Sequence, residues 1–286
     1  MSTMTTQAKT FTMNGTGLIT GLPVTATIEQ GQPGQGIVFI AGGARIPARL
    51  ESIVSTDRGV TLGSFSDGKP TGITLSIVEH VLCAASLAGL DDLVITVEGA
   101  PELPVLDGSA KPWLDAFKQH FGIKPVSATR TLRRAVCWGA NKENDSKDAT
   151  VYALPSDHFG VSYAVHFEGH RDLEQRWVRW DAQSDVSFET LASARTFGYV
   201  RELPVLQARG LAKGVSAENT VGITDDGQYT DALRFDDEPV FHKVLDLIGD
   251  LTLAGINPLS LKAHVFAIRA GHTSHTAFAR ELLKAI

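Results

Sequence analysis

Three side chains able to bind a metal or transfer a proton recur at four-residue spacing: His242, Asp246 and Asp250. On a helix this spacing places all three on one face. An imidazole and a carboxylate at positions i and i+4 can reach the same cation. The same spacing also occurs in surface His–Asp pairs that bind no metal, so both interpretations stand.

A second cluster, Glu79–His80, lies in an earlier segment with helical periodicity. If both segments met, His80, His242 and Asp246 would supply three ligands and leave one tetrahedral position for water, which is typical of catalytic zinc. Glu79 is then placed to accept a proton from that water. Without the other residues, Glu79 would be an ordinary helix-surface glutamate.

His272 follows Gly271 after a strand-like segment, where a tight turn could return it to the same site. Asp250, one turn beyond Asp246, could hydrogen-bond one nitrogen of His272 and raise its pKa, making it a general acid. The alternative is a polar loop histidine without a catalytic role.

Three further features offer positive charge or N–H donors. Lys243 and Arg269 could bind an oxyanion or a phosphate. The segment 210–216, which contains Gly214 and Ser216, could donate backbone N–H groups to an anion. Each alone also fits a solvated cation or an ordinary turn.

The elements that would position these residues occur in a repeated order. The first half predicts short antiparallel strands within 16–50, a helix over 75–88 ended by Gly89, a strand over 93–99 and a helix at about 111–121. The second half predicts strands near 131–138, 150–155, 160–168 and 176–180, and two short helices around 187–210. It closes with a helix within 238–255, a strand over 261–269 and a helix over 274–285.

This repetition predicts a structural duplication of class α+β. We expect two similar two-layer α/β sandwich domains, residues 1–125 and 126–286, with helices on one face of each sheet. The joint would fall near 122–128, and the polar stretch 141–148 would form an exposed hairpin loop.

Composition narrows the class of protein. With 286 residues, 43% hydrophobic and 20% charged, the chain is typical of a soluble folded protein. A net charge of -6 without Lys/Arg runs argues against a nucleic-acid partner. Cys83 and Cys137, the two cysteines, are expected to be buried reduced thiols. The polar N-terminal segment and the lack of long apolar windows predict no membrane span and a cytoplasmic location.

Five segments in this order resemble the family of UDP-3-O-acyl-N-acetylglucosamine deacetylases (LpxC) of lipid A biosynthesis. They are VEHVLCAASLAGLDDLVITVEGAPELPVLDGSA (78–110), SARTFGYV (193–200), RGLAKGVSAENTV (209–221), LRFDDEPVFHKVLDLIGDL (233–251) and AGHTSHTAFARELL (270–283). The resemblance implies two α+β sandwiches facing each other across an active-site cleft. It also implies a lipid-tailed sugar nucleotide as substrate, and we expect a monomer.

The resemblance implies roles for the residues at matching positions. His80, His242 and Asp246 match the ligands of one Zn²⁺, although histidine and carboxylate ligands also suit Fe²⁺. Glu79 matches the general base that activates water against the acetamide carbonyl. His272 matches the general acid that protonates the leaving amine as acetate departs.

The remaining matches concern orientation and substrate contact. Asp250 matches the carboxylate that orients the acidic histidine, while Lys243 and Thr196 match the pair that stabilises the oxyanion. Phe197 matches an aromatic residue lining the sugar site, and Arg269 falls where the family places a cation near the diphosphate.

Three departures bear on substrate choice. Ile19 stands where the family usually has histidine, Ile77 stands where it generally has threonine, and the stretch 167–176 is unusually charged. Ile19 and the charged stretch motivate an alternative, a paralogous zinc amidohydrolase acting on a different acylated amino sugar or sugar nucleotide. A binding protein that kept the fold without turnover is a third hypothesis, which the complete set of matching residues disfavours.

Overall fold

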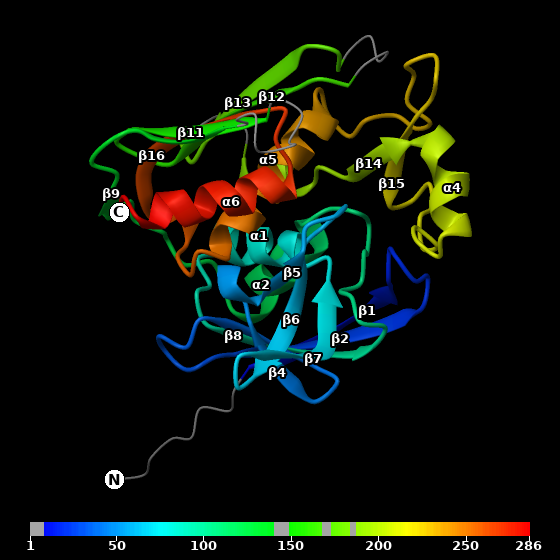
Figure 1. Ribbon diagram of the computed structural model, residues 1–286, viewed down its shortest axis with the longest axis horizontal. Coiled ribbons are helices and arrows are strands. Elements are labelled where there is room, and N and C mark those ends of the chain that lie inside the picture. The colour runs from blue at the N-terminus through cyan, green and yellow to red at the C-terminus, as the bar shows by residue number, and fades with distance from the viewer. Residues whose placement is uncertain (1–8, 140–148, 168–172, 184–186) are drawn as a thin grey trace.

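Two sheets with helices between them make up most of the protein, as seen in the computed structural model (Figure 1). The structure describes residues 9–139, 149–167, 173–183 and 187–286. The first sheet has the order β1 (Thr10–Thr16), β2 (Pro23–Gln30), β8 (Leu93–Gly99), β3 (Ile37–Ala41), β4 (Ala44–Pro47). The second has the order β10 (Val136–Gly139), β11 (Thr150–Pro155), β16 (Leu261–Ile268), β12 (Gly160–Val165), β13 (Arg176–Asp181), with β9 (Arg130–Thr131) also paired to β16.

The two sheets share one topology, which confirms the predicted duplication. In each, the last strand in the sequence enters the centre, parallel to the third strand and antiparallel to the second: β8 beside β3 and β2, β16 beside β12 and β11. A parallel pair needs a long crossover connection. Helix α1 (Glu79–Ala88) precedes β8 and helix α5 (Glu238–Thr252) precedes β16. The α+β class with two sandwich layers is therefore confirmed.

Alternation along the strands shows which face of each sheet is covered. In β16, Leu261, Ala263, Val265 and Ala267 are buried, and the residues between them are more exposed. The covered faces of both sheets turn toward the helices, so that α1, α2 (Lys111–His120), α5 and α6 (His272–Leu283) lie between the two sheets (Figure 1). Every residue of α1 is buried because the helix has protein on all sides.

Helices α1 and α5 cross at very short range. A Cβ atom added to Gly249 in α5 would lie 2.1 Å from the carbonyl oxygen of Glu79 in α1. Further along, the hydroxyls of Ser86 and Thr252 hydrogen-bond at 2.7 Å. A glycine is thus required at the crossing, and it brings the N-terminal end of α1 onto the face of α5 that carries His242.

Smaller elements complete the framework. A three-stranded sheet, β5 (Ile53–Ser55), β6 (Thr61–Ser66) and β7 (Lys69–Ser76), leads into α1. In the second half, α3 (Phe188–Ala192), β14 (Thr196–Tyr199), α4 (Leu203–Ala208) and β15 (Thr220–Ile223) lie between β13 and α5. Short 3₁₀ turns occupy Leu50–Ser52, Val200–Glu202 and Pro258–Ser260.

Four sequence-based expectations need correction. The helix predicted over 75–88 begins at Glu79, because residues 69–76 pair with β6 and Ile77 takes a left-handed conformation (φ 60°). The strand predicted near 131–138 is two strands, β9 and β10. The last helix begins at His272 rather than 274. Cys83 is buried and free, but Cys137 is exposed, because its side chain lies on the uncovered face of β10.

Other expectations were confirmed or fall outside the described residues. Gly89 ends α1 with φ 68°, and the strand over 93–99 has the predicted bounds. The loop 141–148 and residues 168–172 of the charged stretch 167–176 lie outside the described residues. The domain boundary at 125/126 stays a proposal; it falls between α2, which ends at His120, and β9, which begins at Arg130.

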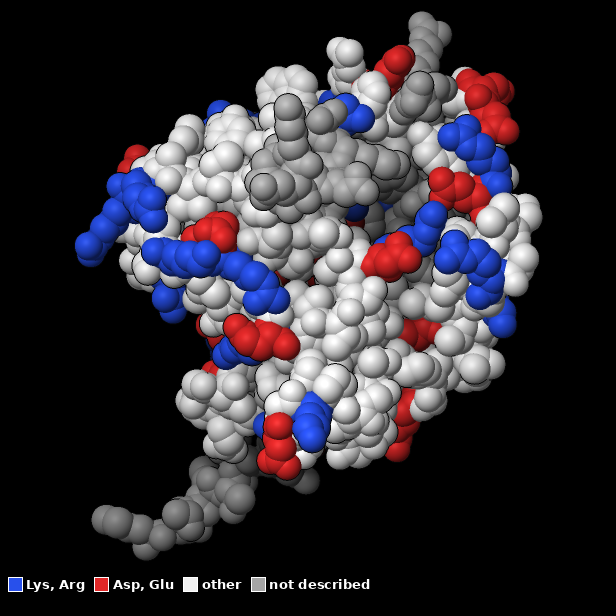
Figure 2. All heavy atoms as spheres, in the orientation of Figure 1, with Lys and Arg blue, Asp and Glu red and all other residues white. Residues whose placement is uncertain are grey.

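The surface carries mixed charge. Figure 2 shows Lys/Arg and Asp/Glu side chains interspersed over one face rather than gathered by sign. Among the described residues, the structure contains no helix with the length and apolar character needed to cross a membrane.

The α1–α5 crossing predicts the effect of one added methyl group. In an unhindered helix interior, Gly→Ala stabilises by about 1 kcal/mol. In Gly249→Ala the new Cβ would meet the Glu79 backbone, and overpacking of this kind costs about 1–3 kcal/mol or more. We expect urea denaturation to show a lower free energy of unfolding.

The matched control is Gly139→Ala, whose new Cβ would meet Thr150 at an ordinary 3.6 Å. Its effect should stay within about 0.5 kcal/mol. A Gly249→Ala protein as stable as the wild type would show that the crossing tolerates a larger separation.

Candidate metal and catalytic site

Three predicted ligands from two helices meet in the interior. His80 comes from α1, and His242 and Asp246 come from α5; all three are buried. Nε2 of His242 lies 3.4 Å and Nε2 of His80 lies 3.8 Å from Oδ1 of Asp246. One ligand atom from each residue falls within 4.8 Å of the others. The group can therefore hold one metal ion, as predicted.

The protonation states of these residues suit a cation. Burial lowers the pKa of His242 and lowers that of His80 to about 3, so both imidazoles are neutral. Nδ1–H of His242 donates to the Ala194 carbonyl (2.9 Å), which leaves the Nε2 lone pair directed at Asp246. Although burial opposes it, Lys243 and the histidines hold the pKa of Asp246 well below its ordinary value. Two neutral nitrogens and one carboxylate fit a divalent metal.

Glu79 lies beside the ligands as the first residue of α1. It is buried, and its Oε2 accepts a hydrogen bond from the backbone N–H of Val60 (3.1 Å). Burial raises its pKa to about 7, against an opposing effect from His272. Gly59 permits the close approach, because a Cβ there would be 3.0 Å from Oε1. A carboxylate with a pKa near neutrality is suited to general-base chemistry.

His272 and Asp250 form the predicted acid pair. Nδ1–H of His272 donates to Oδ2 of Asp250 at 2.8 Å, and Nε2 lies 3.8 Å from Oδ2 of Asp246. Burial opposes the charge on this imidazole, but Asp250 and Asp246 raise its pKa to about 9. His272 is therefore protonated at neutral pH and can donate a proton.

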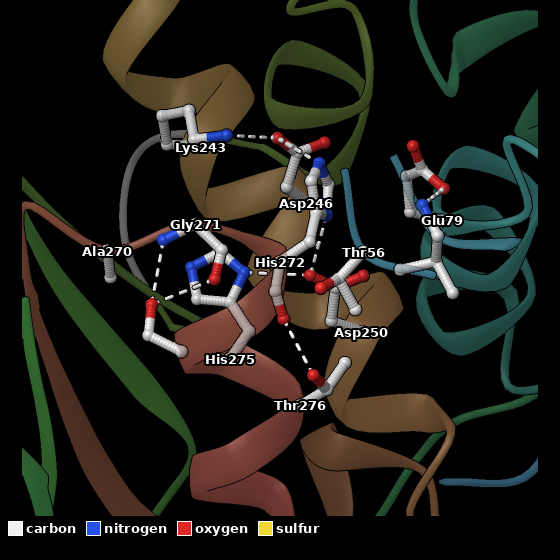
Figure 3. A network of polar contacts seen from close by, with 12 residues as sticks. Thr56, Glu79, Lys243, Asp246, Asp250, Ala270, Gly271, His272, His275 and Thr276 are labelled. Carbon is white, nitrogen blue, oxygen red and sulfur yellow. Dashed lines mark hydrogen bonds and ion pairs between the residues drawn. The ribbon is translucent and has the colours of Figure 1, made fainter. Parts of the chain in front are cut away.

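One residue of this network was not singled out from the sequence. His275 also donates through Nδ1 to Oδ2 of Asp250 at 2.8 Å, so two imidazoles meet at one carboxylate oxygen (Figure 3). The i, i+3 spacing of His272 and His275 could have revealed it. The sequence pattern predicts His272 in a turn before the last helix, and helical spacing has no meaning in a turn.

Lys243 and Thr196, the two residues predicted to stabilise the oxyanion, lie on different elements, α5 and β14. Nζ of Lys243 lies 2.6 Å from Oδ2 of Asp246, next to the ligand group. Thr196 begins β14, and its N–H donates to the Gly108 carbonyl (2.8 Å). Thr196 is two residues from Ala194, whose carbonyl accepts from His242. The segment 194–196 thus lies between α5 and the turn at 107–109.

An aromatic cluster borders the ligands. The ring of Phe197 packs edge-on against His242, with centroids 6.1 Å apart. Phe167 packs against both Phe197 (5.3 Å) and Tyr199 (6.1 Å). Phe197 was predicted from the sequence, whereas Phe167 and Tyr199 were not, because only the fold brings the chain just after β12 next to β14.

A buried ion pair anchors the segment that carries Thr196 and Phe197. Arg195 and Glu238 are both buried; Nε and Nη2 of the arginine lie 2.8 and 3.0 Å from the two carboxylate oxygens. The backbone N–H groups of Arg195 and Arg234 also donate to this carboxylate. The first residue of α5 thus fixes the chain that leads into β14.

The segment 210–216 packs on the loop that contains Ile19. The N–H groups of Lys213 and Gly214 donate to the carbonyls of Ile19 and Leu18, and that of Ser216 donates to Asn219. The backbone donors expected from Gly214 and Ser216 are therefore engaged within the protein. A Cβ at Gly214 would lie 2.0 Å from the Gly17 carbonyl, so close loop packing explains this glycine.

The last predicted substrate residue, Arg269, lies at the exposed end of β16. Its N–H donates to the Ala164 carbonyl at 2.9 Å. Substrate contact by Arg269, Gly214 and Ser216 stays a prediction.

The Arg195–Glu238 pair predicts a stability effect. Glu238→Gln would leave the buried Arg195 charge without its counter-ion, a loss that typically costs about 3–5 kcal/mol. Chemical denaturation measures the change in the free energy of unfolding. Glu189→Gln, which breaks a partly exposed pair with Lys118, is the control and should cost less than about 1 kcal/mol. Equal effects of both changes would contradict the anchoring role.

Comparison with known proteins identifies the family. A family model described as LpxC, UDP-3-O-acyl N-acetylglycosamine deacetylase, matches residues 4–284. A protein of Thermosynechococcus vestitus named UDP-3-O-acyl-N-acetylglucosamine deacetylase is 36% identical over 285 residues, covering 98% of this chain and 94% of the relative. Proteins of the same name from Geotalea uraniireducens (35%; 94% and 85% covered) and Chlamydia muridarum (35%; 96% and 92%) are similarly related. The chain therefore belongs to the LpxC family of UDP-3-O-acyl-N-acetylglucosamine deacetylases.

Proposed function

We propose that this protein removes the N-acetyl group of UDP-3-O-acyl-N-acetylglucosamine by hydrolysis, as a step of lipid A biosynthesis. The observation that supports it is that the buried His80–His242–Asp246 group lies next to one proton acceptor and one proton donor. Glu79 can accept a proton and His272 can donate one. Membership of the family, over nearly the whole chain, supplies the substrate.

We assign Zn²⁺ to the His80–His242–Asp246 group, since two imidazoles and one carboxylate leave an open position in a tetrahedral site. When bound, the ion would lower the pKa of a water molecule and polarise the amide carbonyl. Lys243 keeps Asp246 ionised and adds positive charge beside it. Positive charge here favours the oxyanion that develops on the amide oxygen.

Two residues carry the protons. Glu79 accepts a proton from the attacking water as the water oxygen bonds to the amide carbon. His272 gives one to the amine nitrogen as the carbon–nitrogen bond breaks, yielding acetate and a free amino sugar. Nδ1–H of the protonated His272 ring donates to Asp250, so that the second N–H of the imidazolium, at Nε2, faces the reacting atoms. We assign Thr196, together with Lys243, to the stabilisation of the oxyanion.

The remaining assignments concern the substrate. Phe197, with Phe167 and Tyr199, offers an apolar wall beside His242 for the sugar and the start of its acyl chain. Arg269 would serve the diphosphate. Gly214 and Ser216 would face the sugar nucleotide as part of the segment 210–216, but not as backbone donors, because their N–H groups are engaged within the protein. A monomer in the cytoplasm stays a prediction.

The test is acetate release from UDP-3-O-acyl-N-acetylglucosamine by the zinc-loaded protein. Removing a general base lowers the rate about 10²–10⁴-fold, so Glu79→Gln should lose activity to this extent yet retain zinc. Asp246→Ala should lose zinc, measured by atomic absorption, because a ligand is gone. Glu98→Gln, an exposed change on β8, is the control.

Each outcome has a distinct meaning. Stoichiometric zinc without turnover by the wild type would favour the paralogous amidohydrolase, consistent with Ile19 and Ile77. Equal loss of zinc from Glu79→Gln and Asp246→Ala would contradict the division between base and ligand.

The pKa shifts predict a bell-shaped pH profile for kcat/KM. The base must be ionised, so activity falls as pH drops through the pKa of Glu79, about 7 before a neighbouring cation lowers it. The acid must be protonated, so activity falls as pH rises through the pKa of His272, about 9. Because Glu79 and His272 interact, the two apparent pKa values of the profile describe the site as a whole and not either residue alone. Activity still rising well above pH 9 would rule out His272 as the acid.

A further inference from the structure

The two carboxylate oxygens of buried Asp250 differ in their hydrogen-bond partners. Oδ2 accepts from Nδ1 of both His272 and His275, at 2.8 Å each. Oδ1 is buried and has no hydrogen-bond partner among the described residues. The orientation of this carboxylate therefore depends on the two histidines alone. If one of them moves during proton transfer, the other must hold the group in place.

His272 accepts a hydrogen bond from the Thr276 hydroxyl at its carbonyl oxygen (2.8 Å), which supports the C-terminal side of the residue. His272 is the first residue of α6, directly after Gly271, where the backbone lacks the hydrogen bonds of a helix interior. Its imidazole also faces Asp246 and the ligand group. A proton donor in this position needs anchors on both its side-chain partner and its backbone.

His275 supplies the first anchor. It is fully buried one turn further along α6, and its ring lies away from the ligand group, with Nε2 turned toward Tyr163. Because an ionised carboxylate can only accept, Nδ1 of His275 carries the hydrogen and the tautomer is fixed. His275 thus holds Asp250 without taking part in the chemistry at the cation.

Tyr163 supplies the second anchor. This buried residue of β12 places its hydroxyl 2.9 Å from Nε2 of His275 and 2.7 Å from the carbonyl oxygen of Ala270. Ala270 lies two residues before His272. With Nδ1 as the protonated nitrogen of His275, both Nε2 and the Ala270 carbonyl are acceptors. The single hydroxyl hydrogen of Tyr163 is therefore shared between the ring that supports Asp250 and the chain that enters α6.

We propose that His275 and Tyr163 are positioning residues for proton donation. Together they fix the Asp250 carboxylate and the start of α6, so that His272 is held in the orientation needed to protonate the leaving amine. This inference rests on the proposed function. It predicts that the Tyr163–His275 pair supports the rate of reaction rather than substrate binding, since neither side chain faces the ligand group.

The key comparison is between two substitutions of His275. In His275→Asn the amide nitrogen can take the place of Nδ1 and still donate to Asp250, whereas His275→Leu removes that donor. Loss of an orienting partner typically costs about 10–100-fold, so we expect this decrease in kcat for Leu, an unchanged KM and full zinc content. The Asn variant should recover most of kcat.

Tyr163→Phe tests the second anchor and keeps the ring. It should lower kcat by about 10-fold with KM unchanged, since the hydroxyl is one step further from His272. This variant also serves if His275→Leu does not fold. An unaltered kcat in Tyr163→Phe, a rise in KM alone, or an Asn variant as impaired as Leu would each overturn the proposal.

A spectroscopic measurement separates this proposal from the function. In protein labelled with ¹⁵N in the imidazole rings, the Nδ1–H of His272 bonded to Asp250 should give a downfield proton resonance. The resonance should persist in His275→Asn and broaden or disappear in His275→Leu, with or without substrate. A resonance unchanged in His275→Leu would overturn the positioning role. Inactivity of the wild type on the sugar nucleotide would instead overturn the proposed function.

Discussion

The close crossing of α1 and α5 is the contact on which the site depends. The two helices belong to different halves of a duplicated fold, and neither half holds a complete set of ligands. Gly249 lets the backbone of Glu79 approach where any side chain would collide. Because the crossing lies at the N-terminal end of α1, it delivers Glu79 and His80 together to the face of α5 that carries His242 and Asp246.

Burial then sets the chemistry of these groups. Burial away from water makes an unpaired charge costly. The pKa of each residue therefore shifts in a direction that depends on its neighbours. Glu79 has few compensating contacts, and burial raises its pKa. Asp246 and Asp250 stay ionised beside Lys243 and His272, and these carboxylates in turn keep His272 protonated. One buried environment thus raises the pKa of both a carboxyl group, Glu79, and an imidazole, His272.

The second half contributes the positioning elements around this centre. The Arg195–Glu238 pair joins the start of α5 to the chain entering β14, next to the carbonyl that orients His242. On the other side of α5, Tyr163 and His275 join β12 to α6 behind Asp250. The reactive side chains are therefore held from two directions by buried polar contacts, which cost much more to break than exposed ones.

The sequence by itself determined much of this protein. Helical spacing put His242, Asp246 and Asp250 on one face, and the repeated order of elements predicted the duplication that the sheets confirm. Periodicity failed at 75–78, because Leu75 and Ser76 pair with β6 and Ile77 takes a left-handed conformation before α1 begins. Only the tertiary structure decided which side chains meet. The contact of His275 with Asp250, the pair formed by Arg195 and Glu238, and the role of Gly214 in loop packing all join segments distant in the sequence. Such contacts depend on backbone approach and burial, which residue spacing does not encode.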